Sequence, residues 1–341
     1  MDKTLVPNLE RIFRCHIHGV KPQRKVWLAK SDRGLWIVKG YSQREKAEWV
    51  TRLSVMLHEK GFYHTVQYLG NAEGEKVFPI AGRYYTVMKA IIAREANNAS
   101  LYDVKRSAAT LARFHQAAKG FPAVFTLAGY KPPLLEKWEG RLEEFNRIVS
   151  KIARRGPQNR LEQIVLGLAE QVRNDAEQAL ESSYKMPLAA EMQQAAIRGT
   201  LAHHDVASHN FLITKAGSCY LIDLDTVGSD MQLTDLVQFF GRMLLMQGYS
   251  LYAFYEAIDA YNKIKPLRET QIWMIHQLLR YPDNILREVT GMYAKRPGYR
   301  ARNVQQLLLL ERRYQEERER FLAAEGQILQ RTPWGAYHFV G

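Results

Sequence analysis

Hydrophobic residues follow one spacing in the first quarter of the chain and another in the rest. Up to about residue 90, apolar and polar positions mostly alternate over short runs, which is typical of β-strands. The runs "KVWLAKS" (25–31) and "GLWIVKGY" (34–41) predict two strands joined by a hairpin turn at "DRG". The run "VFPIAGRYYTVMKAII" (77–92) predicts two more strands, with a turn near Ala81 and Gly82.

A single helix is predicted between the two pairs of strands. Residues 42–62 carry apolar side chains at helical spacing. Ser42 is followed three residues later by Glu45, as in a capping box, and Gly61 is expected to end the helix. The order strand, strand, helix, strand, strand indicates a small antiparallel sheet with one helix packed on it.

Helical spacing dominates after residue 100. Long amphipathic helices are predicted over residues 101–120, 133–156 and 159–184, and almost everything from Asp235 to about residue 329 is also predicted to be helical. We therefore predict an α+β protein with two lobes. Residues 1–90 would form a small N-terminal lobe of sheet plus helix, and residues 91–341 a large, mostly helical C-terminal lobe.

Composition excludes several classes of protein. The chain has 341 residues, 46% hydrophobic and 24% charged, as in ordinary globular proteins. No run approaches the roughly eighteen apolar residues of a membrane span, and the N-terminus lacks the apolar core of a signal peptide, so we expect synthesis and folding in the cytosol. With only Cys15 and Cys219, a disulfide framework or cysteine-based zinc site is not expected.

The net charge of +13 is compatible with an anionic partner, but it is also compatible with a solvated basic surface. The basic residues are scattered along the chain, and no nucleic-acid recognition motif is present. Charge alone therefore supports only a general hypothesis, a protein that binds an anionic surface, and we expect no nucleic-acid partner.

Polar side chains are concentrated in "LAHHDVASHNFLI" (201–213) and "IDLDT" (222–226). The short apolar runs around "TKAG" predict a β-hairpin, which would place Asn210 beside Asp223, with Asp205 on the preceding loop. Oxygen ligands beside a further carboxylate suit Mg²⁺ and a phosphate, as phosphoryl transfer requires.

Two simpler explanations compete with this interpretation. Aspartate and asparagine are common in turns, so the same residues could be ordinary turn formers. A zinc site made by His203, His204 and His209 is disfavoured, because their spacing fits no regular ligand set and no thiol lies nearby.

The N-terminal lobe offers a matching group for a phosphate. Lys39 ends a predicted strand, where its ammonium could reach the α- and β-phosphates of a nucleotide. Glu48 lies on the following helix and could pair with Lys39, although Glu45 is an alternative partner on the same helix.

These motifs together resemble the aminoglycoside phosphotransferase and choline kinase branch of the protein-kinase-like fold. The loop H-x-D-x-x-x-x-N runs from His203 to Asn210, and the strand I-D-x-D is "IDLD". Within that branch, "IIAREANN" (91–98), "AATLARFHQAAKGF" (108–121) and "IDLDTVGSDMQLTDLVQFFGRML" (222–244) are similar to the spore coat CotS/CotI/YutH family. The resemblance extends from about residue 8 to residue 325.

The resemblance implies a role for each matching residue. It implies ATP and Mg²⁺ as cofactors, with Asp205 as the catalytic base and His203 as a residue that orients the loop. Asp235 would be a structural aspartate that caps the next helix. The implied binding residues are Lys39 and Glu48 for phosphate, the backbone of Met88, Lys89 and Ala90 for adenine, and Asn210, Asp223 and Asp225 for the metal.

The chain departs from the family pattern at two places. His204 stands where a small residue usually precedes the catalytic aspartate. The expected phosphate-covering loop, near "HIHGVKPQRK", has only Gly19, so it cannot approach phosphate as closely as a glycine-rich loop. Its basic residues Lys21, Arg24 and Lys25 could compensate as point charges.

The function expected from this resemblance is a small-molecule kinase that transfers the γ-phosphoryl group of ATP to a hydroxyl. A neutral or anionic sugar-like acceptor is favoured, because no concentrated acidic patch is present in the C-terminal lobe. The alternative is a structural component of the spore coat that keeps the fold with little or no turnover. Either would be expected in the spore coat, with other coat proteins as further partners.

Overall fold

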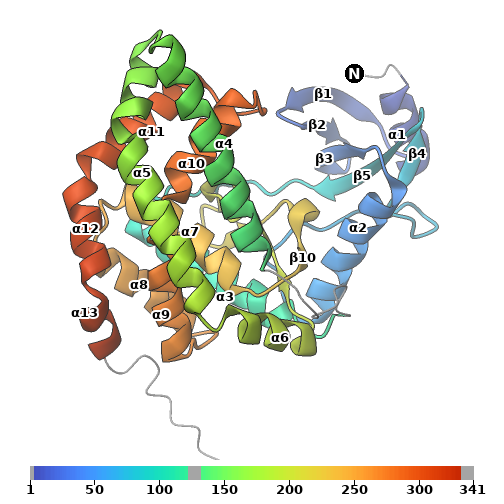
Figure 1. Ribbon diagram of the computed structural model, residues 1–341. Helices are drawn as coiled ribbons and strands as arrows, with labels where there is room; N and C mark the ends of the chain where they lie inside the picture. The colour runs from blue at the N-terminus through green and yellow to red at the C-terminus, as the bar shows by residue number, and fades with distance from the viewer. Residues whose placement is uncertain (1–3, 122–131, 332–341) are drawn as a thin grey trace, which may run out of the picture.

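The computed structural model describes residues 4–121 and 132–331, which form a small sheet and a large group of helices (Figure 1). The antiparallel sheet has five strands in the order β1-β2-β3-β5-β4. The strands are β1 (Ile17–Gln23), β2 (Val26–Ser31), β3 (Gly34–Tyr41), β4 (Phe78–Ile80) and β5 (Arg83–Lys89). The two predicted hairpins are confirmed.

Two helices cover the two faces of this sheet. Helix α1 (Leu5–Phe13) buries Leu5, Leu9 and Phe13 in one cluster with side chains of β3, β4 and β5. Helix α2 (Arg44–Glu59) belongs to the larger core cluster, with Val50 and Leu53 fully buried. Successive residues of a strand point to opposite faces, so the alternation along β3 supplies both clusters.

Two parts of the N-terminal lobe differ from the sequence prediction. Neither α1 nor β1 was expected, because α1 is short and β1 contains Pro22 and several polar residues. Proline lacks an N–H and is tolerated on an edge strand, and β1 is an edge strand of this sheet.

The capping box predicted for α2 is wrong. The helix begins one residue later than expected, with Gln43 as N-cap and no side-chain hydrogen bond at the cap, so Ser42 and Glu45 do not form the box. Its predicted end is confirmed, because Gly61 has a positive φ and donates its N–H to His58 O.

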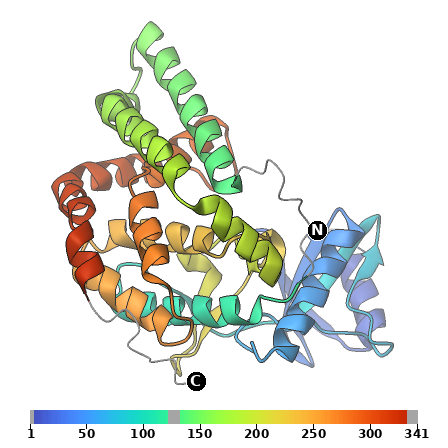
Figure 2. The same cartoon turned by 60° about the horizontal axis from the view of Figure 1, so that its bottom comes forward.

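The predicted long helices of the second part are confirmed, and Figure 2 shows α4 and α5 running side by side. The helices are α3 (Leu101–Ala117), α4 (Pro133–Arg155), α5 (Arg160–Lys185), α6 (Leu188–Arg198), α7 (Leu233–Met246), α8 (Leu251–Asn262), α9 (Glu269–Leu278), α10 (Asp283–Tyr293), α11 (Ala301–Arg313), α12 (Gln315–Ala323) and α13 (Glu325–Gln330). None of the helices in the described ranges has both the length and the hydropathy needed to cross a membrane.

Two small sheets lie between the five-stranded sheet and the helices. Strand β8 (Phe211–Ile213) pairs with β6 (Arg94–Glu95) on one side and β9 (Cys219–Leu221) on the other, while β7 (Leu201–Ala202) pairs with β10 (Gly228–Ser229). The segment after α2 joins the two parts, because Leu221 N–H donates to His64 O and Thr65 Oγ1 donates to Leu221 O.

A close backbone crossing fixes the position of β7. Phe121 N–H donates to Gly199 O at 2.9 Å, and Leu201 N–H donates to Ala118 O at 2.9 Å. Gly199 has φ +57°, and an added Cβ would lie 1.9 Å from Phe121 O. Only glycine fits this crossing, which holds the start of β7 against the end of α3.

We expect Gly199→Ala to lower the free energy of unfolding by about 3 kcal/mol or more, because backbone strain and a backbone clash act together. Gly61→Ala is the matched control, since Gly61 also has a positive φ but an added Cβ would meet nothing within 4 Å. Urea denaturation followed by circular dichroism measures both values. Equal losses in the two variants would contradict the proposed crossing.

Candidate active site

The buried carboxylate of Asp235 holds the loop between β7 and β8. His203 N–H donates to Asp235 Oδ2 at 2.5 Å, and His204 N–H donates to Asp235 Oδ1 at 2.8 Å. A third contact comes from His115 Nε2, 3.0 Å from Oδ2. Asp235 lies in the first turn of α7, but the N-cap is Gln232, so the expected capping role of Asp235 is wrong. Its carboxylate binds the loop instead.

The charge state of this group follows from its contacts. Burial opposes the charged form of Asp235, but the hydrogen bond and charge of His115 hold the pKa of this carboxyl below its usual value. Burial lowers the pKa of His115 to about 4, so its ring is neutral. The neutral ring donates from Nε2 to Asp235 and accepts at Nδ1 from the Tyr261 hydroxyl, 2.7 Å away.

The side chain of His203 is fully buried inside the loop. Its Nε2 lies 3.0 Å from Ile222 O, a carbonyl that can only accept, so Nε2 carries the hydrogen. Its Nδ1 accepts from Asp205 N–H at 3.4 Å. This geometry fits the expected role of His203 in orienting the loop, because the ring links the loop to the residue before Asp223.

Asp205 is about one-third exposed, and two groups contact its carboxylate. Asn210 Nδ2 donates to Asp205 Oδ2 at 3.0 Å and to Asp205 O at 2.8 Å. Arg242 Nη1 lies 3.4 Å from Oδ1. Arg242 was not identified from the sequence, although it follows Asp235 by seven residues on α7, a spacing that puts both on one helix face.

The predicted hairpin brings Asn210 next to Asp223. In the ladder between β8 and β9, Phe211 pairs with Leu221, and Ile222 N–H donates to Asn210 O at 2.9 Å. Asp223 has φ +64°, which is uncommon for a residue with a side chain and turns the chain out of β9.

Lys39 reaches from β3 to both acidic residues of this turn. Its Nζ lies 2.7 Å from Asp223 Oδ1 and 2.8 Å from Asp225 Oδ2, and Tyr41 donates its hydroxyl to Asp225 Oδ1 at 3.1 Å. Burial opposes the charge on Lys39, but the two carboxylates raise its pKa overall. Burial also opposes the charge on Asp223, yet Lys39 lowers the pKa of this carboxyl overall.

Glu48 does not pair with Lys39 in this structure. Glu48 Oε1 lies 2.7 Å from Arg44 Nε, one turn away on the exposed side of α2. Glu45, the alternative partner, is also exposed. The expected pair is therefore wrong for this arrangement, because the rotation of α2 on the sheet turns both glutamates to solvent while Lys39 binds two aspartates.

The residues expected to bind a metal carry only oxygen donors. Asp223 and Asp225 each contribute a carboxylate, and Asn210 contributes an amide, a set that suits Mg²⁺. Among the described residues, no group of three or more His, Cys, Asp or Glu is arranged to hold a metal ion. The two carboxylates of Asp223 and Asp225 therefore need the amide oxygen of Asn210 as a third ligand to suit Mg²⁺.

The alternative zinc site is not supported by the side-chain contacts of its histidines. The rings of His203 and His204 each bind a backbone carbonyl, of Ile222 and Thr226 respectively, and His209 is exposed.

The segment expected to bind adenine has fewer available amides than predicted. Lys89 N–H donates to Gln67 O at 3.1 Å, and Ala90 N–H donates to Leu35 O at 2.9 Å. Met88 is buried and pairs with β3. Neither the Lys89 nor the Ala90 amide is therefore free to donate to a base. In the segment that follows, the side chain of Ile92 is exposed.

The turn between β1 and β2 lies close to the acidic residues. Arg24 has φ +52° and pairs with Glu95 of β6, with Nη2 2.8 Å from Oε1. The charge of Lys25 contributes to the lowered pKa of Asp223, after the larger effects of burial and Lys39. Gly19 lies within β1, so the turn presents basic side chains.

His204 adjoins Asp205 and makes two ring contacts of its own. Its Nδ1 lies 2.9 Å from Thr226 O and its Nε2 lies 2.9 Å from Asp230 Oδ2. A carbonyl and a carboxylate both accept, so only the protonated ring can donate to both. Burial opposes that charge, but the Asp230 hydrogen bond and the charges of Asp235 and Asp230 raise the pKa of His204 overall.

Comparison with known proteins identifies similar families and folds. The family model described as "Spore coat putative kinase YutH" matches residues 7–324, whereas a search of curated proteins finds no match. An aminoglycoside phosphotransferase of Alicyclobacillus acidocaldarius has a TM-score of 0.81 at 17% identity, over 96% of each chain.

Two further solved structures resemble the chain less closely. Spectinomycin phosphotransferase APH(9)-Ia, solved with ADP and spectinomycin, has a TM-score of 0.65 at 14% identity, over 95% of this chain and 98% of its own. An ethanolamine kinase of Plasmodium vivax has a TM-score of 0.54 at 13% identity, over 92% and 86% respectively. At these identities the likeness shows the fold, and the expected α+β, kinase-like fold is confirmed.

We predict that His204 stabilises the protein more in acid than in base. A histidine whose folded pKa is raised contributes stability below its unfolded pKa of about 6.5, and this contribution is lost as the pH rises through the folded pKa. The difference in free energy of unfolding between the wild type and His204→Gln should therefore be larger at about pH 5.5 than at about pH 9. Urea titrations at both pH values test this, and a difference independent of pH would show that the ring is not charged.

Proposed function

Because the chain belongs to the YutH family of spore coat kinase-like proteins, we propose that it is an ATP- and Mg²⁺-dependent phosphotransferase acting on a hydroxyl of a small molecule. One observation carries the proposal. A continuous network joins Lys39 of the sheet, the acidic turn at Asp223 and Asp225, and the Asp205–Asn210 pair. Such a network puts a phosphate-binding cation, oxygen ligands and a base within one region.

Each residue of the network has a task in this reaction. Asp205 accepts the proton of the acceptor hydroxyl as its oxygen forms a bond to the γ-phosphorus. The bond from that phosphorus to the bridging oxygen of ADP breaks. Asn210 donates to one carboxylate oxygen of Asp205, Oδ2. The other oxygen, Oδ1, lies near Arg242. Lys39 binds the phosphates, and Lys25 adds positive charge near them.

Mg²⁺, when bound, neutralises the negative charge of the phosphates, and Asn210, Asp223 and Asp225 would hold it. His203 and Asp235 keep the loop in place without touching the substrate. We assign the nucleotide lobe to residues 1–90 and the catalytic lobe to residues 91–341. Adenine would bind the exposed segment after Ala90.

A second candidate is a structural protein of the spore coat that keeps the fold without turnover. One observation favours it, because the β1–β2 turn has no glycine and is held by the Arg24–Glu95 ion pair. Such a turn cannot approach phosphate as closely as a glycine-rich loop.

We predict that ATP with Mg²⁺ raises the melting temperature. A ligand at 100 times its Kd stabilises the folded state by about 2.7 kcal/mol. Differential scanning fluorimetry and isothermal titration calorimetry measure the effect, and ATP with EDTA is the control. No shift and no heat at saturating ATP–Mg²⁺ would refute nucleotide binding.

We also predict that Asp205→Asn and Asp223→Asn have different effects. Asp205 contacts the acceptor, so its variant should keep ATP–Mg²⁺ affinity within a few-fold and lose about 10²–10⁴ in the rate of phosphoryl transfer. Asp223 belongs to the metal site, so its variant should lose metal-dependent affinity as well. Rates of ATP consumption and calorimetric Kd values are compared for the three proteins. Equal ATP consumption in the wild type and Asp205→Asn, across a broad acceptor panel, would favour the structural protein.

A further inference from the structure

Four basic side chains gather where three helices meet, and one of them, Arg242, contacts Asp205. Lys137 and Arg141 lie on α4, Arg242 on α7 and Arg287 on α10, and α10 packs on both other helices. Their charges affect one another, since desolvation lowers the pKa of Lys137 and the charges of Arg141, Arg242 and Arg287 lower it further, against the opposing charge of Asp283. We refer to these four residues as the basic cluster.

Acidic groups balance only part of this charge. Asp283 pairs with Arg141 and, at 3.7 Å, with Arg287, which also pairs with Glu288 at 3.2 Å. Two arginines thus share two carboxylates. Of the remaining two cations, Arg242 contacts Asp205, the proposed base, and Lys137 is influenced by the charge of Asp283 without a direct ion pair in the described ranges.

Arg242 and Lys137, the other two members of the cluster, have fewer acidic partners than Arg141 and Arg287. Among the residues that the structure describes, Arg242 hydrogen-bonds only Asp205, at 3.4 Å, and burial and the charge of Arg287 lower its pKa to about 10. Lys137 is exposed at the mouth of the pocket and has no hydrogen bond or ion pair to any residue in the ranges 4–121 and 132–331. A cation without a partner, beside other cations, favours an anion from outside the chain.

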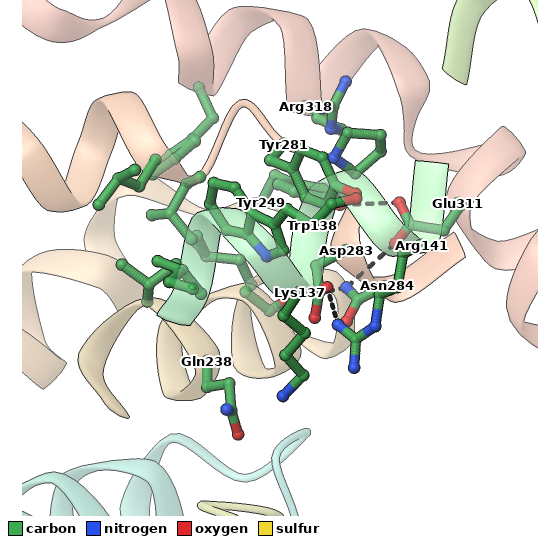
Figure 3. A pocket seen from close by; sticks show the side chains of 18 residues that line it. Lys137, Trp138, Arg141, Gln238, Tyr249, Tyr281, Asp283, Asn284, Glu311 and Arg318 are labelled. Carbon is green, nitrogen blue, oxygen red and sulfur yellow. Dashed lines mark hydrogen bonds and ion pairs between the residues drawn. The ribbon is translucent and has the colours of Figure 1, made fainter. Parts of the chain in front are cut away.

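Two members of the cluster, Lys137 and Arg141, line a pocket that Gln238 also lines. Figure 3 shows Lys137 and Gln238 with their polar ends pointing the same way, away from the stacked rings of Trp138 and Tyr281. Gln238 Nε2 donates to His204 O at 3.2 Å, which links the pocket to the residue before Asp205. An acceptor in the mouth of this pocket would therefore lie close to both the basic cluster and the base.

We propose that the basic cluster binds an anionic group, a carboxylate or a phosphate, on the acceptor whose hydroxyl is presented to Asp205. This proposal rests on the proposed function and names its substrate class. The acceptor is a polyol or sugar that carries a negative charge. An acceptor bearing an ammonium group is disfavoured, because its charge would be repelled by Lys137 and Arg242.

The first test measures binding without requiring turnover. Glucose 6-phosphate, glucuronate, glucose and glucosamine are titrated calorimetrically into the full chain, with and without ADP–Mg²⁺. The two anionic sugars should bind at least about ten-fold more tightly than glucose, because charge-assisted hydrogen bonds are the stronger ones. The phosphate and the carboxylate distinguish the two kinds of anion.

Variants of one residue test whether the basic cluster is responsible. Lys137→Gln should weaken binding of the anionic sugars about ten-fold and leave glucose unaffected, while Lys137→Arg should retain the preference. Lys151→Gln is the matched control, because Lys151 is an exposed lysine of the same helix, about 21 Å further along its axis. The same variants are compared for KM in an ATP-consumption assay with product identified by mass spectrometry.

The outcomes separate the two proposals. Loss of anion preference in Lys137→Gln with ATP–Mg²⁺ affinity unchanged supports the basic cluster as the acceptor site. The same loss without any ATP–Mg²⁺ binding in the wild type supports an anion site but refutes the kinase. Equal affinity for charged and neutral sugars, no binding of either anionic sugar, or an unaffected Lys137→Gln variant overturns the acceptor proposal, whatever the nucleotide results.

Discussion

The buried carboxylate of Asp235 is the constraint on which the rest of the site depends. It accepts from two consecutive backbone amides and from the neutral ring of His115, so its charge is compensated without solvent. The two amides set the path of the loop, and that path sets the direction of Asp205. A buried carboxylate that loses its hydrogen-bond donors lowers the stability of the fold, so the three contacts of Asp235 are expected to form or break together.

One face of α7 contacts both the backbone of the loop and the carboxylate of Asp205. Along α7, Asp235, Gln238 and Arg242 are spaced by three and four residues and lie on one face. They contact, in turn, the amides of the loop, the carbonyl of His204 and the carboxylate of Asp205. A rigid helix therefore positions the loop backbone and the carboxylate of Asp205 together.

Local patterns could be predicted from the sequence, whereas contacts between distant elements could not. The hairpin around "TKAG" follows from a short turn between alternating strands, and it determines that Asn210 adjoins Asp223. The Glu48 pairing failed because helix spacing does not reveal how α2 is rotated on the sheet. That the amides of Lys89 and Ala90 already donate to Gln67 and Leu35 could not be predicted, because these partners are remote in sequence. The basic cluster joins residues of three helices, with Lys137 and Arg242 105 positions apart, and it could not be predicted for the same reason, because it depends on the packing of α10 on both α4 and α7.

The bridge from Lys39 to Asp223 and Asp225 has a thermodynamic consequence for the proposed ligands. Free Mg²⁺ would have to displace the ammonium and leave it without a partner, and metal-free ATP would attract the ammonium and leave two carboxylates facing the phosphates. If both ligands bound, Lys39 would pair with the phosphates and the two carboxylates with the metal, so every charge would keep a partner. Each ligand thus strengthens the other, and this positive coupling is reciprocal by linkage. The ion pair would make the proposed site cooperative for the metal–nucleotide complex and would disfavour either component alone.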